Sequence, residues 1–277
     1  MQNYLNTKYD LNDSSLVSVI DELPFWSAPF GMELLNAIEL KKNINVLDIG
    51  SGLGFPLLEV AMRLGDSCKI YGIDPWQTAI ERIKEKIDIY GIRNVNIIEG
   101  NAENIPLEDN SIDLIISNNG LNNVQDLNKS LSECSRILKK DAPIIFTMNL
   151  NTSFREFYKV YIDILIDNDL YAEVEKLQQH IYSKRKPIDE IINLLINNNI
   201  RVINYKENNF IIKCLDGTTF FNHFLIKLAF LPSWMDIVEI KKQKLIFSQL
   251  EDTLNKKAED GELTFSVPFV TFQCGKI

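Results

Sequence analysis

The stretch NVLDIGSGLGFP, residues 45–56, decides the fold of this chain. A run of apolar residues broken only by Asp48 leads into three alternating glycines, Gly50, Gly52 and Gly54. An almost continuous apolar run is typical of a parallel strand that is buried on both faces. Glycines directly after such a strand let the backbone pass close to a ligand, because they carry no side chain. The stretch therefore predicts a ligand-binding loop at the end of a buried strand.

Strand and helix patterns alternate on both sides of this loop as far as residue 150. Strands are expected at 44–50, 69–74, 95–100, 112–119 and 142–150, and helices with one apolar face at 57–64, 76–91 and 124–138. Such alternation indicates βαβ units with right-handed crossovers. We therefore expect an α/β fold with a doubly wound, Rossmann-like sheet.

Beyond residue 150 the pattern becomes mainly helical. Helices are expected at 153–182, 187–198, 218–231 and 236–259, and 200–217 is either one interrupted strand or a hairpin. The tail LTFSVPFVTFQC, residues 263–274, alternates like a strand and slips by one after Pro268, which is the expected mark of a bulge. We expect the tail to lie antiparallel beside the fifth strand, so that the sheet has seven strands, mostly parallel with one antiparallel.

We expect a single domain, because the chain has no internal repeat and no Gly/Ser linker. Its expected parts are an N-terminal arm or lid (1–40), a ligand-binding core (41–150), two helical insertions that form a cap over the carboxyl ends of the strands (151–186 and 214–262), and two segments that complete the sheet (187–213 and 263–277).

Composition favours a globular cytoplasmic protein. The chain has 277 residues, of which 45% are hydrophobic and 24% charged, with a net charge of -9 that disfavours nucleic acid and anionic membranes as partners. Its four scattered cysteines fit neither a zinc site nor a disulfide framework, so a reduced compartment is expected. The polar N-terminus does not resemble a signal peptide, and no run reaches the roughly 18 apolar residues of a membrane span.

The glycine loop does not match the loops that hold phosphates. A dinucleotide loop needs a third glycine where this chain has Phe55 or Leu57, and a P-loop needs a Gly-Lys-Ser/Thr sequence that is missing. Asp74 closes the second strand, twenty residues after Gly54. A carboxylate there can accept both hydroxyls of a ribose, but NAD enzymes use the same arrangement.

A third motif, EGNAENIPLEDNSIDLIISN at residues 99–118, distinguishes an NAD site from other nucleoside sites. Taken in order, the chain resembles the class I S-adenosylmethionine-dependent methyltransferases, especially their UbiE-like branch, over about residues 40–150. The matching pieces are Asp48-Ile49-Gly50-Ser51-Gly52-Leu53-Gly54, Gly72-Ile73-Asp74, Gly100-Asn101-Ala102-Glu103, Pro106 and Asp113.

This resemblance implies a role for most of the matching residues. Asp48 would anchor the methionine amino group of S-adenosyl-L-methionine, while Gly50 and Gly52 give close backbone approach. Asp74 would hold the ribose hydroxyls, and Pro75 would lie against the adenine.

The remaining matches fall after the third and fourth strands. Asn101 and Ala102 would meet the adenine edge, with the Ala102 N–H donating to a ring nitrogen, and the Asn118 carbonyl would face the methionine ammonium. Ser51 and Glu103 complete the expected cofactor site. Many family members have Asp where this chain has Asn101, whose amide oxygen still accepts a hydrogen bond.

The segment LPFWSAPFG, residues 23–31, lies where N-terminal segments of this family commonly fold over the cofactor. Trp26 and Phe30, with Phe55 of the glycine loop, are therefore candidates for a lid or for contacts with the methyl acceptor. Simple packing of an N-terminal arm explains the segment equally well.

The expected reaction is methyl transfer to an oxygen, nitrogen, carbon or sulfur atom of a small, partly apolar molecule. No residue identifies itself as a catalytic base, and the two histidines, His180 and His223, are too far apart in sequence to suggest a metal site. The acceptor and the oligomeric state cannot be deduced from the sequence. Two alternatives stay open: a protein that binds S-adenosylmethionine without catalysis, and an NAD-dependent oxidoreductase.

Overall fold

A computed structural model describes residues 3–21, 26–261 and 263–277. The chain divides into two compact units. The first, called here the sheet unit, comprises Asp10–Leu150, Lys186–Asn208 and Phe269–Ile277. The second, called the helical unit, comprises Met1–Tyr9, Asn151–Arg185 and Asn209–Pro268.

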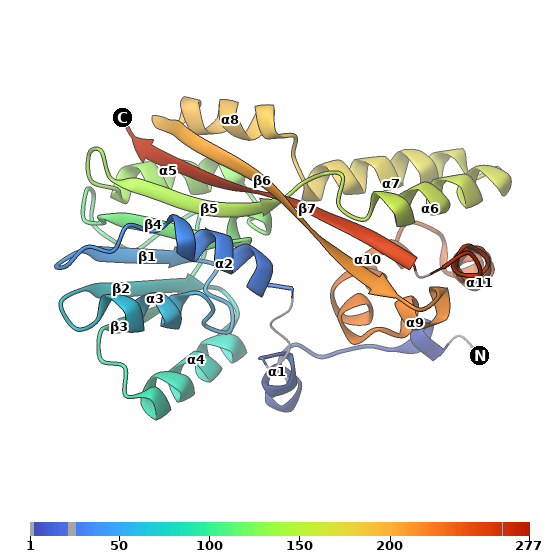
Figure 1. The fold of residues 1–277 in the computed structure, drawn as a ribbon, viewed down its shortest axis with the longest axis horizontal. Coiled ribbons are helices and arrows are strands. Elements are labelled where there is room, and N and C mark those ends of the chain that lie inside the picture. The colour runs from blue at the N-terminus through green and yellow to red at the C-terminus, as the bar shows by residue number, and fades with distance from the viewer. Residues whose placement is uncertain (1–2, 22–25, 262) are drawn as a thin grey trace. The chain divides into compact units, whose positions relative to one another are not determined.

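The seven-stranded sheet has the order β3-β2-β1-β4-β5-β7-β6 (Figure 1). Its strands are β1 (Asn45–Ile49), β2 (Lys69–Asp74), β3 (Val95–Glu99), β4 (Leu114–Asn118), β5 (Pro143–Asn149), β6 (Ile200–Cys214) and β7 (Leu263–Lys276). The first five strands pair in parallel, and β7 pairs antiparallel with β5. The predicted sheet, with its tail strand inserted beside the fifth, is confirmed.

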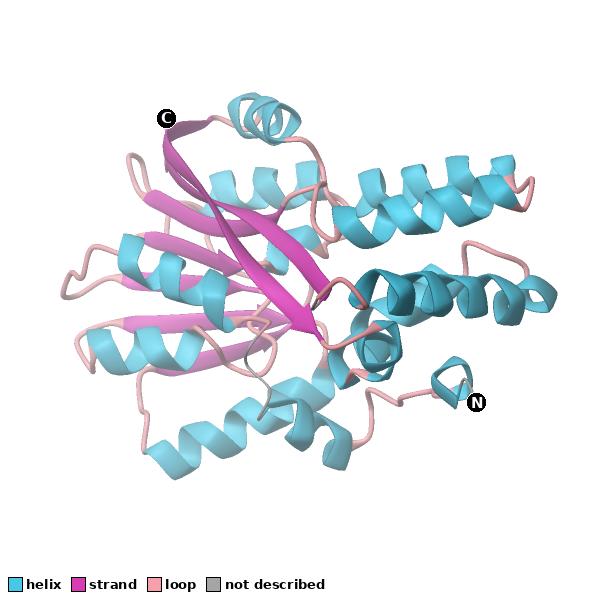
Figure 2. Ribbon diagram, turned by 45° about the vertical axis from the view of Figure 1, so that its right-hand side comes forward, coloured by secondary structure: helices cyan, strands magenta, loops and turns pink. Residues whose placement is uncertain are grey.

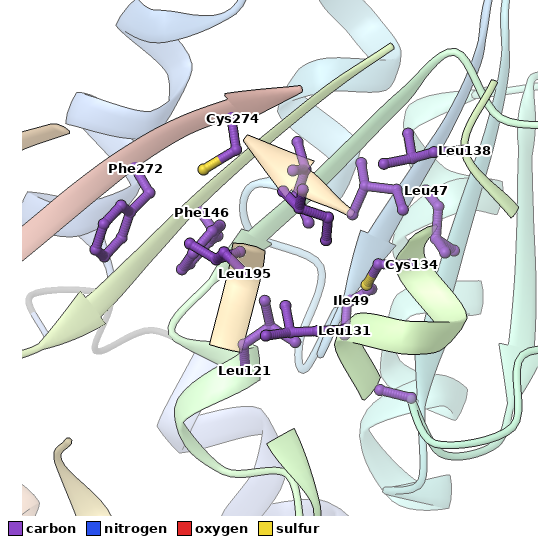
Figure 3. Close-up of a cluster of buried hydrophobic side chains, with 14 of the residues drawn as sticks. Leu47, Ile49, Leu121, Leu131, Cys134, Leu138, Phe146, Leu195, Phe272 and Cys274 are labelled. Atoms are coloured by element: carbon purple, nitrogen blue, oxygen red, sulfur yellow. The ribbon is translucent and has the colours of Figure 1, made fainter. Parts of the chain in front are cut away.

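Helices cover both faces of this sheet in the sheet unit. They are α1 (Ser14–Asp21), α2 (Ala28–Ala37), α3 (Leu57–Leu64), α4 (Gln77–Tyr90), α5 (Leu127–Ile137) and α8 (Ile188–Asn197), with a short 3₁₀ turn η2 (Gly120–Asn122). One apolar core joins α2 and α3 to the sheet, and a second joins α5 and α8 to its opposite face (Figure 3). Cys134 and Cys274 lie in the second core as small apolar residues.

The helical unit is built of helices apart from the ends of β6 and β7 (Figure 2). Its helices are η1 (Asn3–Asn6), α6 (Arg155–Asp167), α7 (Tyr171–Lys184), α9 (Gly217–Asn222), a π-helical turn η3 (Ile226–Phe230), α10 (Leu231–Met235) and α11 (Ile240–Ala258). That this unit forms a cap over the carboxyl ends of the strands stays a prediction.

Two long helices expected in this unit are each broken. The predicted helix 153–182 is α6 followed by α7, because Asn168 bonds back to the Ile164 carbonyl (2.8 Å) and Asp169 takes a positive φ of 58°. Both features are typical of a helix end. The predicted helix 218–231 is likewise divided among α9, η3 and α10.

The two long strands differ from expectation in opposite ways. Residues 200–214 form one uninterrupted strand, so both predicted alternatives, an interrupted strand and a hairpin, are wrong. From Phe269 to Gly275, β7 pairs with β5 residue for residue, with no inserted residue. Side chains on both faces of β7 are buried over 269–272. Burial on both faces therefore explains why the alternation of apolar and polar residues shifts after Pro268.

Candidate cofactor site

The predicted site residues gather at one edge of the sheet. Asp48, Asp74 and Asn118 lie at the carboxyl ends of β1, β2 and β4, and Asn101 follows the end of β3. The strand order reverses between β1 and β4. In open α/β sheets, ligands bind outside the carboxyl ends of the strands at such a switch point. The predicted residues therefore meet where the fold itself predicts a ligand.

Glycine is required in the loop after β1 for steric reasons. Gly50 and Gly52 take positive φ angles of 75° and 49°. A Cβ atom on Gly50 would lie 2.6 Å from the Cα atom of Gly120, whereas one on Gly52 would meet no atom of the described residues within 4 Å. Gly50 thus lets two loops touch, and Gly52 borders open space beside the site.

The backbone N–H groups of this loop are used within the protein. Two of them donate to the Ile73 carbonyl at 2.9 and 3.2 Å. Gly52 donates to Oδ2 of Asp74 at 2.8 Å, and Gly54 donates to the Ser51 carbonyl at 2.8 Å. A phosphate-binding loop needs such donors free and pointing at the ligand. This loop is therefore poorly suited to a pyrophosphate.

Asp48 is the most unusual group of the site. Its side chain is fully buried, and among the described residues neither carboxylate oxygen has a hydrogen bond of regular geometry, although the Leu57 N–H is near enough to interact weakly with it. Burial, and secondarily the charge of Asp74, raises the pKa of Asp48 to about 8, against a smaller opposing effect of the Leu57 N–H. A buried carboxylate without a regular hydrogen bond is unstable when charged, so this position fits a cationic ligand group.

Asp74 is held rigidly at the end of β2. Its two carboxylate oxygens accept the N–H groups of Gly52 (2.8 Å) and Trp76 (2.9 Å). Each oxygen keeps a further lone pair, so the carboxylate can still accept two hydroxyl groups. The Asp74 carbonyl also accepts the N–H of Gly100 at 3.1 Å, which ties the loop after β3 to the same edge.

The loop after β3 presents the expected adenine contacts. Asn101 is exposed and Ala102 is buried, and within the described residues the Ala102 N–H has no hydrogen-bond partner. Pro75 is exposed after Asp74. Glu103 is occupied differently, because its Oε1 atom accepts two backbone N–H groups of the turn before α5, at 2.8 and 3.1 Å. The structure thus gives Glu103 a structural contact.

Asn118 is fixed by both ends of its amide. Its Nδ2 atom donates to the Ser27 carbonyl (3.1 Å), and its Oδ1 atom accepts the Thr147 hydroxyl (3.0 Å). Sequence reasoning missed Ser27 and Thr147. The available signal was Thr147 itself, a polar residue in the otherwise apolar run of β5.

The candidate lid residues pack around the start of α2. Phe30 is fully buried, 4.6 Å from the Phe269 ring and 5.5 Å from the half-buried Trp26 ring. The Phe55 ring lies against Gly31, where an added Cβ would be 2.1 Å from it. Residues 22–25, which include Leu23, Pro24 and Phe25 of the predicted lid, lie outside the described residues.

The arm that precedes this segment is bonded to α4. Asp21, at the end of α1, pairs with Arg82 (3.0 Å) and with Lys86, whose ammonium also reaches the Leu53 carbonyl of the glycine loop (2.6 Å). The indole N–H of Trp76 donates to the Leu11 carbonyl at 2.9 Å. The arm is therefore attached next to the glycine loop and the end of β2.

Comparison with known proteins identifies methyltransferases as the relatives of this chain. Residues 40–213 match the family model of a methyltransferase domain. The UbiE ubiquinone/menaquinone biosynthesis C-methyltransferase of Rickettsia prowazekii is 31% identical over 161 residues, which cover 56% of this chain and 62% of that protein. The 2-phytyl-1,4-naphtoquinone methyltransferase of Trichormus variabilis is 33% identical over 124 residues, covering 43% and 54%. The matches thus span less than two thirds of either relative.

The fold has solved counterparts as well. The crystal structure of a SAM-dependent methyltransferase from Aquifex aeolicus matches with a TM-score of 0.51 at 22% identity, covering 72% of this chain and 92% of that one. The family model covers more than half of the chain, so the protein belongs to the methyltransferase-domain family. Its sequence relatives are of the UbiE type that the motifs predicted.

S-adenosylmethionine is the cofactor that follows from this membership, and the residues present fit it. The unpartnered carboxylate of Asp48 suits its ammonium group, and the loop offers no phosphate site. Among the described residues, no cluster of three or more His, Cys, Asp or Glu side chains could hold a metal ion. None of the described helices is long and apolar enough to cross a bilayer.

Proposed function

We propose that the protein transfers a methyl group from S-adenosylmethionine to a small, partly apolar molecule. The observation that carries this proposal is Asp48 at the end of β1, a fully buried carboxylate for which the described part of the chain supplies no regular hydrogen bond and no cation. Bound S-adenosylmethionine supplies a methyl group on a positively charged sulfur, which is already activated for transfer. The protein then has mainly to position the two reactants and exclude water.

We assign the binding roles as the motifs predicted. Asp48 accepts hydrogen bonds from the methionine ammonium, and the Asn118 carbonyl faces the same group. Asp74 accepts the ribose hydroxyls from a position fixed by two backbone N–H groups. The Ala102 N–H donates to the adenine ring, and Asn101 accepts from the adenine amine.

The acceptor is the part of the proposal that rests on relatives. Two of them are named for quinones, which combine a flat, largely apolar ring with polar carbonyl groups. The aromatic residues of the helical unit, in contrast, lend no support to an apolar acceptor, because the largest of them are buried against one another. We retain Trp26, Phe30 and Phe55 as the proposed lid or acceptor contacts, on the α2 face of the sheet unit.

Two features disfavour the NAD-dependent alternative: the negative charge of nearby carboxylates and the internal hydrogen bonds of N–H groups in the glycine loop. The loop N–H groups that would hold a pyrophosphate are already bonded within the protein. The start of α3, the usual place for a phosphate, lies next to the Asp48 carboxylate and its neighbour Asp74. A protein that binds S-adenosylmethionine without catalysis keeps every feature described, so only an activity assay separates it.

We also propose a cytoplasmic location and no nucleic-acid partner. The four cysteines are free and buried, which suits a reducing compartment. The net charge of -9 opposes binding to a polyanion.

Calorimetry tests the cofactor assignment. S-adenosylmethionine and S-adenosylhomocysteine are expected to bind the full chain, and NAD and ATP are not. Asp48→Asn should weaken binding of S-adenosylmethionine. The control Asp66→Asn should not, because the Asp66 side chain is 70% exposed and belongs to a surface ion pair. Tight binding of NAD would overturn the proposal. A screen of small-molecule acceptors for S-adenosylhomocysteine release then separates an enzyme from a binding protein.

A further inference from the structure

A row of polar side chains crosses the carboxyl edge of the sheet on the face that α2 covers. Asn118 pairs with Thr147 across β4 and β5, and Thr147 pairs with Thr271 across β5 and β7. Paired residues point to the same face of a sheet, and so do residues two apart in one strand. Asn149 therefore belongs to the same row. Two residues nearer the strand starts, the same face is apolar at Ile116 and Ile145.

Hydrogen bonds divide this row into two parts. Asn118 and Thr147 bond to each other, and Asn118 also bonds to Ser27. Asn149 Oδ1 and Thr271 Oγ1 have no partner among the described residues, although the two side chains are only 8% and 5% exposed. Buried polar atoms are nearly always hydrogen-bonded, so a pair without partners in one row needs an explanation.

The spacing of these two side chains suits a bridging group. Asn149 lies opposite Phe269, so Thr271 is its diagonal neighbour across the strand pair. Diagonal neighbours lie roughly 7–8 Å apart, which is too far for a direct bond between short side chains. A hydroxyl group can bond to both side chains, because it donates to the amide oxygen of Asn149 and accepts from the Thr271 hydroxyl. A carbonyl, by contrast, accepts from the Thr271 hydroxyl and leaves the amide oxygen of Asn149 without a donor.

The neighbours of Asn149 and Thr271 on this face of the sheet include aromatic rings. Phe269 is opposite Asn149 and contacts Phe30, with ring centroids 4.6 Å apart. The row itself contains amide and hydroxyl groups and no charged side chain. These neighbours favour an uncharged ligand with an aromatic or apolar body and one hydroxyl group.

We propose that Asn149 and Thr271 bind a hydroxyl group of the methyl acceptor. This inference rests on the proposed function, because the row begins at Asn118, beside the expected cofactor position. The two residues would be positioning residues that set acceptor specificity. They would select uncharged hydroxylated molecules over the same molecules with the hydroxyl capped.

A pair of matched probes tests this selection. Binding of 4-fluorophenol and of 4-fluoroanisole, which lacks the hydroxyl hydrogen, is measured by fluorine NMR on the full chain saturated with S-adenosylhomocysteine. The wild type should bind the phenol about tenfold more tightly. Thr271→Val and Asn149→Leu should each weaken phenol binding about two- to tenfold, with anisole binding unchanged. Equal binding of both probes to the wild type, or phenol binding unaffected in both variants, would overturn the proposal.

Controls separate this role from stability and from the proposed function. Thr147→Val removes a hydroxyl of the same row that is bonded to Asn118, so it should lower the thermal midpoint and leave the phenol-to-anisole ratio unchanged. Thr271→Val and Asn149→Leu remove unpartnered atoms and should not lower the midpoint. S-adenosylhomocysteine binding is measured without probe. If the wild type does not bind S-adenosylhomocysteine, the proposed function is contradicted. If it binds, but the phenol-to-anisole ratio is the same in the wild type and in the Thr271 and Asn149 variants, only the present inference is contradicted.

Discussion

The two units bury polar groups in opposite ways. In the helical unit, Trp234 is fully buried in an aromatic cluster, and its indole N–H donates to the Tyr158 hydroxyl at 3.0 Å. The Tyr161 hydroxyl donates in turn to the Trp234 carbonyl at 2.9 Å. In the sheet unit, Asp48 is equally buried and neither carboxylate oxygen has a regular hydrogen bond within the described residues.

This difference separates a core from a candidate site. A buried polar group that is fully bonded stabilises one packing arrangement, whereas an unbonded one destabilises the protein until a ligand supplies the partner. Burial alone therefore does not identify a functional residue. Unpartnered polar atoms concentrate at the carboxyl edge of the sheet, at Asp48, Ser51, Asn119, Asn149 and Thr271.

The largest effect is expected in the aromatic cluster. Trp234→Ala should lower the free energy of unfolding by about 3–5 kcal/mol. The centroid of the indole lies 4.2 Å from that of the Phe157 ring, so its removal leaves a large void in the cluster. Urea unfolding measures the loss. The matched variant Trp26→Ala removes a half-buried indole and should have a clearly smaller effect. Equal losses would show that the cluster is not the core of its unit.

The second effect concerns the pH dependence of stability at Asp48. Its pKa is about 8 in the folded protein, above the ordinary Asp value. Between about pH 4 and 8 the folded protein keeps a proton that the unfolded chain has lost, so stability falls as the pH rises, by up to about 1.4 kcal/mol per unit. Asp48→Asn should flatten this slope in denaturant titrations, and Asp66→Asn should not.

The same proton links stability to cofactor binding. A cationic group next to Asp48 lowers its pKa, so binding of S-adenosylhomocysteine at pH 7 should be accompanied by proton release. Calorimetry in buffers of different ionisation enthalpy measures this release. Binding without proton release would show that the cationic group of the ligand does not lie next to Asp48.

A third, smaller effect is expected at Asp74. Asp74→Ala should weaken S-adenosylhomocysteine binding by tenfold or more, because two ribose hydrogen bonds to a charged acceptor are lost. It should also reduce stability, since the Gly52 and Trp76 N–H groups lose their acceptor. Glu99, the paired residue at the end of β3, is the matched control. If Glu99→Ala weakens binding as much as Asp74→Ala, the ribose assignment is wrong.

The smallest effect is expected for a bonded charge. Asp21→Asn weakens the partly buried pairs with Arg82 and Lys86 and should lower the unfolding free energy by about 1 kcal/mol, because the Asn oxygen still accepts hydrogen bonds from the two cations. Glu85→Gln, at an Arg82 partner that is 61% exposed, should have still less effect. A larger loss for Asp21→Asn, seen by thermal unfolding, would mean that the arm attached to α4 contributes to the sheet unit more than a surface ion pair does.

Local patterns in the sequence were sufficient for much of the fold, and the expected cofactor residues stay predictions that the structure places at one edge of the sheet. Strand and helix periods identified the five parallel strands, and β7 was predicted beside β5. The cofactor residues follow strand ends in short motifs, so residues close in sequence report on one place in the fold. Long-range partners were not predictable. Glu103 stood in a motif, yet its carboxylate accepts N–H groups more than twenty residues away.

By itself, the sequence determined the positions of the five parallel strands and of the glycine loop, because both depend on neighbouring residues: continuous apolar runs for the buried strands and glycines for the loop. Only the tertiary structure decided which buried polar atoms have partners. Asn149 and Thr271 are far apart in the chain and come together through the antiparallel pairing of β5 with β7. The aromatic residues beyond residue 150 were equally ambiguous until packing placed them in a core, since side-chain type does not specify what a side chain touches.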